Sequence, residues 1–358
     1  MSSILYYITG HGYGHAVRSS QVIHSLQRLR SDLKIHVRTT APEWLFPPSA
    51  VHTRQSIDIG IVQRDSLEMD FSATLQACRD LRARTAALIE EELAFIRDND
   101  IRLIVGDIPA LCFEIAAQAS IPSVAITNFT WNTIYRGYLQ NYPEFAPIIR
   151  DMEGFYAKAT VALILPYGCD VDVFPRRESI PWIARSSTLT REAARAKLEL
   201  PRCATIVLLS FGGLGLSRFP LDKLKELRNF FFVATGETSK QEDNFLVLPD
   251  AQRQYEDLVR AVDVIVTKPG YGIVADALAH KLPMLYTERG EFAEYPRLVQ
   301  ALSDLATAEF ISQSELLRGN IGPYVRRLLA NAPHWPYVAL DGAMTAARRI
   351  LALLDSPQ

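Results

Sequence analysis

Residues 4–15 read ILYYITGHGYGH, an apolar run that leads directly into a turn with three glycines. The run predicts a buried strand over Ile4–Thr9, and apolar residues then recur at helical spacing from Val22 to Leu29. A strand, a glycine turn and a helix are the opening of a βαβ unit, in which the turn lets a ligand approach the backbone. The stretch therefore predicts a parallel sheet with a ligand-facing first loop.

The same alternation continues along the chain and then restarts. In the first half, strands are expected at 34–38, 103–105, 123–127 and 160–165, and helices at 74–98 and 113–119. In the second half, a helix is expected at 190–200, and strands at 206–210, 230–235, 262–267, 283–286 and 308–311. Alternating strands and helices predict α/β domains whose parallel sheets are covered on both faces.

Prolines and a loss of periodicity mark residues 166–189 as an interdomain linker. We therefore expect two doubly wound, Rossmann-like domains, residues 1–165 and 190–339. Residues 340–358 contain a last helix that can pack back on the first domain.

Composition limits the function. The 358 residues, 48% hydrophobic and 22% charged, suit two globular domains. The net charge of −2 argues against a nucleic-acid partner. Four dispersed cysteines without a CxxC pair argue against a zinc site or a disulfide framework and suit a reducing compartment. Neither a signal peptide nor a stretch of ~20 apolar residues is visible, so a cytoplasmic protein without a transmembrane segment is expected.

The first candidate site is the turn after the first strand. A histidine at the carboxyl edge of a parallel sheet can act as a general base, and we assign this role to His15. Asp107, at the end of the strand 103–106, is placed to orient it. The alternative is a tight turn with locally bonded histidines and a loop-capping Asp107. The other expected acceptor-side residues are His11, Gly12, Tyr13, Gly14, Asn128 and Trp131.

The second candidate site follows the strand 262–267. Lys268, Gly270, Tyr271 and Gly272 precede a helix, whose free N–H groups would bind a diphosphate. Asp276, one turn into that helix, could accept hydrogen bonds from ribose hydroxyls. An ordinary strand-to-helix turn is the alternative. The opposing glycine loop contains Ser210, Gly212 and Gly213.

Two short acidic patterns, Asp170-Val171-Asp172 and Asp98-Asn99-Asp100, could bind a divalent metal beside a diphosphate. Because so short a pattern occurs twice, we interpret both as solvated surface and predict no metal site.

Taken together, these loops resemble the GT-B glycosyltransferases. The stretch from Lys268 to Asp276 is similar, without gaps, to their donor motif, although plant enzymes have His and Glu at its two ends. The run from Gly10 to Arg18 resembles more specifically the glycosyltransferase-like N-terminal half of plant L-arabinokinases. It is also similar to the glycine loop of the bacterial GlcNAc transferase of peptidoglycan synthesis, apart from His11 and Tyr13.

The resemblance implies two domains that face each other across a cleft and a nucleotide-sugar-dependent transferase that inverts its donor without a metal. It implies that Glu294 contacts the donor sugar. The donor would be a UDP- or GDP-type nucleoside diphosphate-sugar, with no tightly bound cofactor. The acceptor would be a sugar, a lipid or another small molecule. Two alternatives stay open: a non-catalytic sugar-nucleotide-binding protein and a GT-B sugar-nucleotide epimerase.

Overall fold

The computed structural model describes residues 3–63, 69–211, 220–237, 239–249, 255–290 and 292–356. The chain forms two compact units. The first contains residues 1–183, 291–294 and 341–358, and the second contains residues 184–290 and 295–340. Within the described ranges, no helix has the length and apolar character that crossing a bilayer requires.

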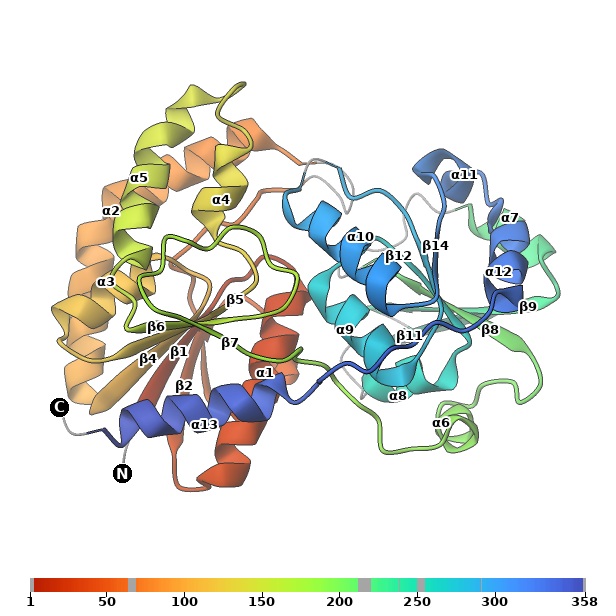
Figure 1. Cartoon of the computed structure of the whole chain (residues 1–358), viewed down its shortest axis with the longest axis horizontal. Coiled ribbons are helices and arrows are strands. Elements are labelled where there is room, and N and C mark those ends of the chain that lie inside the picture. The colour runs from red at the N-terminus through yellow and green to blue at the C-terminus, as the bar shows by residue number, and fades with distance from the viewer. Residues whose placement is uncertain are drawn as a thin grey trace. The chain divides into compact units, whose positions relative to one another are not determined.

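The first unit is built on a seven-stranded sheet in which every neighbouring pair is parallel. Its order is β3-β2-β1-β4-β5-β6-β7 (Figure 1). The strands are β1 (Ser3–Ile8), β2 (Lys34–Thr39), β3 (Val51–Arg54), β4 (Ile101–Asp107), β5 (Ser123–Thr127), β6 (Val161–Ile164) and β7 (Arg177–Ser179).

Helices cover both faces of this sheet. They are α1 (Tyr13–Leu29), α2 (Phe71–Asp98), α3 (Leu111–Gln118), α4 (Trp131–Arg136), α5 (Ala146–Tyr156) and α13 (Gly342–Leu354). Leu5 and Tyr7 of β1 pack with α2, α3 and α5 in one buried cluster. Because successive side chains of a strand point to opposite faces, Ile4 and Tyr6 face the other side, where α1 and α13 lie against each other (Figure 1).

The second unit contains another seven-stranded sheet, in the order β10-β11-β9-β8-β12-β13-β14. Only the β10–β11 pair among these described strands is antiparallel. The strands are β8 (Thr205–Ser210), β9 (Phe230–Gly236), β10 (Lys240–Glu242), β11 (Phe245–Pro249), β12 (Val264–Thr267), β13 (Met284–Tyr286) and β14 (Ala308–Phe310).

The helices of this half are α6 (Arg191–Lys197), α7 (Leu221–Glu226), α8 (Tyr255–Ala261), α9 (Tyr271–His280), α10 (Glu294–Leu305), α11 (Gln313–Leu317) and α12 (Ile321–Ala330). Val207 and Leu209 of β8 pack with apolar residues of α7 and α12. The hydroxyl of Thr190 accepts a hydrogen bond from the amide of Ala193 at 3.2 Å, so Thr190 is the N-cap of α6.

The strand orders place one switch point in each sheet. In the first unit the order reverses between β1 and β4, and Ile8 pairs with Asp107 at their carboxyl ends. In the second unit it reverses between β8 and β12, where Ser210 pairs with Thr267. Ligands of open α/β sheets bind outside the carboxyl ends of strands at such points. Both glycine-containing turns predicted as sites follow strands at these two positions.

The structure adds elements that the sequence pattern did not indicate. The edge strands β3 and β7 have four and three residues, mostly exposed, so they contain no apolar run. Strand β7 lies within residues 166–189, where a linker was expected. Helix α13 belongs to the first unit.

Candidate functional site

The first cluster lies at the β1/β4 switch point. Gly12 is the N-cap of α1 with a φ of 71°, a backbone conformation that glycine adopts without strain. A Cβ on Gly10 would lie 1.8 Å from the Thr40 hydroxyl, so the turn passes too close to β2 for any side chain. The helix that follows places His15 in its first turn and buries it to 7% exposure.

His15 and Asp107 form the predicted pair. Nδ1 of His15 lies 2.8 Å from Oδ1 of Asp107, which is fully buried. Arg18, one turn further along α1, donates to both oxygens of the same carboxylate, from Nε at 2.7 Å and from Nη2 at 2.5 Å. The hydroxyl of Ser19 also donates to Oδ2, at 2.8 Å. The carboxylate therefore accepts from three side chains.

Electrostatics determine the protonation of this cluster. Burial by itself would raise the pKa of the Asp107 carboxyl, but the Arg18 guanidinium and His15 hold it well below its usual range. Because an ionised carboxylate only accepts hydrogen bonds, the contact with Asp107 requires a proton on Nδ1 of His15. In the neutral tautomer of this kind, Nε2 carries the lone pair that a general base needs. Nη2 of Arg18 lies 3.0 Å from the same Nδ1 and then donates to Asp107 rather than to His15.

A chain of polar contacts continues from Arg18 to Asn128 and Glu294. Nη1 of Arg18 donates to Oδ1 of Asn128 at 2.6 Å. Nδ2 of Asn128 donates to Oε1 of Glu294 at 2.6 Å. A guanidinium only donates and a carboxylate only accepts, so the amide of Asn128 can have only this orientation. Glu294, expected among the donor residues, is thus a buried neighbour of Asn128 within the first unit.

Aromatic rings surround the same turn. The ring of His11 packs edge-on against Trp131 at 5.2 Å and stacks on Phe292 at 6.3 Å. Nε1 of Trp131 donates to Asp58 at 3.0 Å, and burial raises the pKa of that carboxyl. Tyr13 lies edge-on against Trp44 at 5.9 Å, and Gly14 is exposed. Of the expected acceptor-side residues, His11 thus contacts both Trp131 and Phe292, and Asn128 belongs to the network around Asp107.

The second cluster lies at the β8/β12 switch point. Gly270 is the N-cap of α9, so no side-chain hydrogen bond caps this helix. Tyr271 is its first residue and Gly272 its second. The Ser210 hydroxyl lies 2.7 Å from that of Tyr255, while the Ser210 carbonyl accepts from the Thr267 hydroxyl. Lys268 is half-buried, and Arg289 donates to the carbonyl of Pro269 at 3.1 Å. Gly212 and Gly213 lie outside the described residues.

Asp276 is held by an arginine that the sequence analysis did not single out. Oδ1 of Asp276 accepts the backbone N–H of Arg185 at 2.9 Å, and Oδ2 accepts from Nε at 3.0 Å and Nη2 at 2.5 Å. The guanidinium also lies over the Tyr255 ring, 4.4 Å from its centroid. Burial opposes the charge of Arg185, but Asp276 raises the pKa of this guanidinium above its usual value.

The sequence analysis also missed the role of Arg18. The signal was present, because Arg18 follows His15 by three residues and side chains at this spacing share one face of a helix. For Arg185, near the start of the second unit, the sequence offered no periodicity or motif. Within the described residues, no group of three or more His, Cys, Asp and Glu side chains is arranged to hold a metal ion.

Comparison with known proteins identifies the family of the chain. The family model for glycosyl transferase family 1 matches residues 2–292. The chain is 30% identical over 339 residues to an L-arabinokinase from Arabidopsis thaliana. This match covers 92% of the chain and 32% of the relative, so the chain spans about a third of that protein's length.

Solved glycosyltransferases share the fold over nearly all of the chain. The structure of Phytolacca americana UGT2 complexed with UDP-2-fluoro-glucose and pterostilbene matches with a TM-score of 0.61 and 13% identity, covering 99% of this chain and 94% of that one. MurG of Acinetobacter baumannii matches with a TM-score of 0.56 and 13% identity, covering 98% and 99%. The chain has the GT-B fold and belongs to glycosyl transferase family 1.

Proposed function

We propose that the chain transfers a sugar from a nucleoside diphosphate-sugar to an acceptor hydroxyl by a single displacement with inversion. The observation that carries this proposal is the 2.8 Å contact between Nδ1 of His15 and Asp107, which suits the neutral tautomer whose Nε2 can accept a proton. The acceptor O–H would give its proton to Nε2 while its oxygen bonds to the anomeric carbon. The bond from that carbon to the diphosphate oxygen would break, and the nucleoside diphosphate would leave with the electron pair.

Groups of the second unit suit the leaving diphosphate. The N-terminus of α9 offers N–H groups without a side-chain cap, and the helix dipole favours negative charge there. Lys268 precedes α9, and Arg289 follows β13. Both add positive charge near the N-terminus of α9. We propose that these groups stabilise the leaving group in place of a metal ion, together with Ser210 at the end of β8.

Asp276 is proposed to bind the ribose. Its Oδ1 accepts one N–H from Arg185, and a carboxylate oxygen has a second lone pair that a ribose hydroxyl could use. Arg185 would then position the Asp276 carboxylate, and Asp276 itself would contact the ribose. Support for a UDP-type donor comes from the plant structure named above, whose complex contains UDP-2-fluoro-glucose.

Two measurements on the same protein test this function. A thermal-shift panel of uridine, guanosine and thymidine diphosphates and their sugars should give one family that stabilises the protein, by ~2.7 kcal/mol at a hundredfold excess over Kd. His15→Ala should keep this shift and lose turnover ~10²-fold or more. The control is His334→Ala, which changes an exposed histidine of the second unit. No shift with any nucleotide would refute the donor site, and turnover that survives His15→Ala would refute the base.

A further inference from the structure

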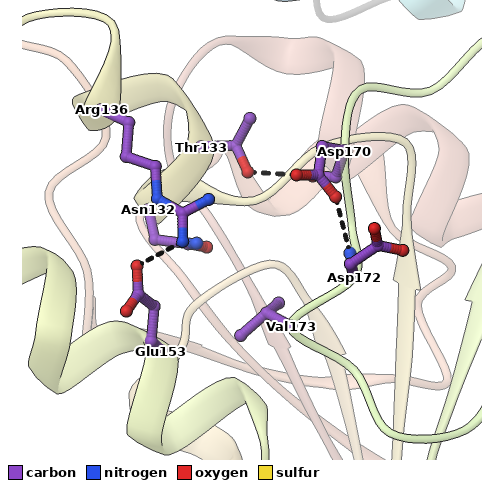
Figure 2. Close-up of a pocket in the computed structure, with 7 residues that line it drawn as sticks. All are labelled: Asn132, Thr133, Arg136, Glu153, Asp170, Asp172 and Val173. Atoms are coloured by element: carbon purple, nitrogen blue, oxygen red, sulfur yellow. Dashed lines mark hydrogen bonds and ion pairs between the residues drawn. The ribbon is translucent and has the colours of Figure 1, made fainter.

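A hollow of about 410 Å³ lies in the first unit, beside the loop that contains Asn128. Figure 2 shows it between α4, α5 and the segment that follows β6. Its lining consists almost entirely of hydrogen-bonding side chains, namely Asn132, Thr133, Arg136, Glu153, Asp170 and Asp172, together with Val173. The volume falls within the ~300–1,000 Å³ that small-molecule sites occupy. With a single apolar side chain, this lining suits a hydroxyl-rich ligand rather than a lipid.

The walls of the hollow are fixed by contacts within the first unit. The Thr133 hydroxyl donates to the carbonyl of Asp170 at 2.9 Å, and the amide of Asp172 donates to Oδ1 of Asp170 at 2.9 Å (Figure 2). Arg136 pairs with Glu153 at 2.7 Å across the opposite wall. A site whose polar groups are already positioned loses less entropy when a ligand binds.

Asn132 supplies an independent sign of a missing partner. This residue is 1% exposed, and its Oδ1 finds no hydrogen-bond partner in the part of the chain that the structure describes. Buried polar atoms in native proteins are nearly always bonded, so an unsatisfied one calls for an explanation. An amide oxygen needs a donor, and the ligand must therefore carry hydroxyl or ammonium groups.

The charges around the hollow select among such ligands. Glu153 is paired with Arg136, and Asp172 is paired with Arg177. Asp170 is the acidic residue of the lining that has no cationic partner among the described residues. The lining therefore carries a net negative charge. The negative charge of the lining would repel an anion such as phosphate. The hollow therefore differs in its ligand preference from the proposed diphosphate site. A neutral polyol needs no compensating charge and can donate to both Asp170 and Asn132.

Backbone and ring contacts connect the segments that line the hollow with the loop beside the proposed base. The carbonyl of Asn128, whose side chain contacts Arg18, accepts the amide of Cys169 at 2.7 Å and so anchors the loop that carries Asp170. Phe129 packs edge-on against His15 at 5.4 Å. From Phe129 to Asn132 the chain advances three residues, at most ~11 Å between Cα atoms.

We propose that this hollow binds a neutral carbohydrate and that the sugar is part of the acceptor. The assignment rests on the proposed transferase function, and it narrows the acceptor class from a sugar, a lipid or another small molecule to a sugar. Asp170 and Asn132 accept hydrogen bonds from its hydroxyls, and Thr133 and Arg136 bind at the rim.

Binding without turnover tests the assignment. Saturation-transfer NMR and calorimetry on the full chain would use D-glucose, D-galactose, D-mannose and their methyl glycosides, with inorganic phosphate as the anionic probe. At least one neutral sugar should bind, and phosphate should not compete with it. Asp170→Ala and Asn132→Leu should each weaken binding about tenfold or more, the value of one good hydrogen bond. Asn132→Leu should fold at least as well as the wild type, since it removes a buried acceptor without a partner.

Asp151→Ala is the matched control, because Asp151 lies on α5 and pairs with Arg82 outside the hollow. It should leave sugar binding unchanged. Failure of every neutral sugar to bind, or binding that survives both Asp170→Ala and Asn132→Leu, would overturn the assignment. Nucleotide-induced thermal shifts measured on the same samples separate the two proposals. A nucleotide shift without sugar binding refutes the sugar site alone. Sugar binding that depends on Asp170 without any nucleotide shift supports the sugar site and refutes the proposed donor.

Discussion

Asp107→Asn is the perturbation for which the structure gives the firmest expectation. The change keeps the shape of the side chain but removes the negative charge that Arg18 contacts through Nε and Nη2. The Arg18 side chain is 3% exposed, so the variant removes the carboxylate of a buried ion pair. Breaking a buried ion pair in this way costs ~3–5 kcal/mol of the free energy of unfolding. For a domain of this size the loss corresponds to a fall in Tm of ~6–20 °C.

The first unit contains its own control for this experiment. Arg30 and Asp355 form the same kind of two-pronged pair, at 2.9 and 2.5 Å, but their side chains are 28% and 55% exposed. Asp355→Asn should therefore cost no more than ~1 kcal/mol. Urea unfolding and calorimetry of both variants give the comparison. Equal losses in the two variants would refute the claim that burial makes the Asp107 pair strong.

The pH dependence of the difference gives a second readout. The pKa of the Asp107 carboxyl is lower in the folded chain than in the unfolded chain. Its stabilisation is therefore complete above the unfolded pKa of ~3.9 and is lost as the pH falls toward the folded value. The gap between wild type and Asp107→Asn should be flat at neutral pH and should shrink below pH ~4. A gap that instead widens on acidification would contradict the assignment of an ionised Asp107.

Three further expectations follow. Arg18→Lys keeps the positive charge but loses the two-pronged contact with Asp107. Turnover should therefore fall with a changed pH–rate profile, while donor-induced thermal shifts stay the same. An unchanged pH–rate profile would argue against Arg18 as a positioning residue. Asp276→Asn should weaken nucleotide binding about tenfold in calorimetry, since one hydrogen bond to the ribose is lost, and unaltered binding would exclude Asp276 from the donor site. Burial raises the pKa of Asp58, so ionisation of this group opposes folding as the pH rises through ~3.9 and above. Asp58→Asn should remove that part of the slope of Tm against pH. An identical slope in the variant would show that Asp58 does not titrate in this way.

The sequence predicted the parallel strands well because buried strands of a parallel sheet are continuous apolar runs. The strand predicted at 123–127 coincides with β5, and the one at 4–9 differs from β1 by a single residue at each end. The edge strands were not predicted from the sequence, for the opposite reason. Strand β7 has one half-buried residue between two exposed ones, so burial imposes no pattern on its sequence. The strand β10 is also short and mostly exposed.

The pairing of His15 with Asp107 was predictable because Asp107 ends β4 and His15 lies in the first turn of the helix after β1, and the order of these strands is common in doubly wound sheets. The partner of Asp276 was not predictable in this way. Arg185 lies 91 residues before Asp276 in a segment without helical or strand periodicity, and only the folded chain brings the two together. The same is true of Glu294, whose contact with Asn128 joins residues 166 positions apart.

The contact of Glu294 with Asn128 has a consequence for the proposed reaction. Glu294 is the first residue of α10, and within the first unit its carboxylate accepts a hydrogen bond from Asn128. Asn128 cannot turn its amide toward another partner without losing Arg18, because Arg18 offers only donors. If Glu294 binds a donor hydroxyl, as the family resemblance implies, it must either use its second oxygen or release Asn128. In the first case Asn128→Leu should lower donor affinity, because Glu294 loses the amide that orients it. In the second case the same variant should raise donor affinity, because a competing partner is removed. Calorimetry of Asn128→Leu with the nucleotide-sugar that stabilises the wild type distinguishes the two. We expect the first outcome, since Asn128 is fully buried and its 2.6 Å contact orients the carboxylate before the donor arrives.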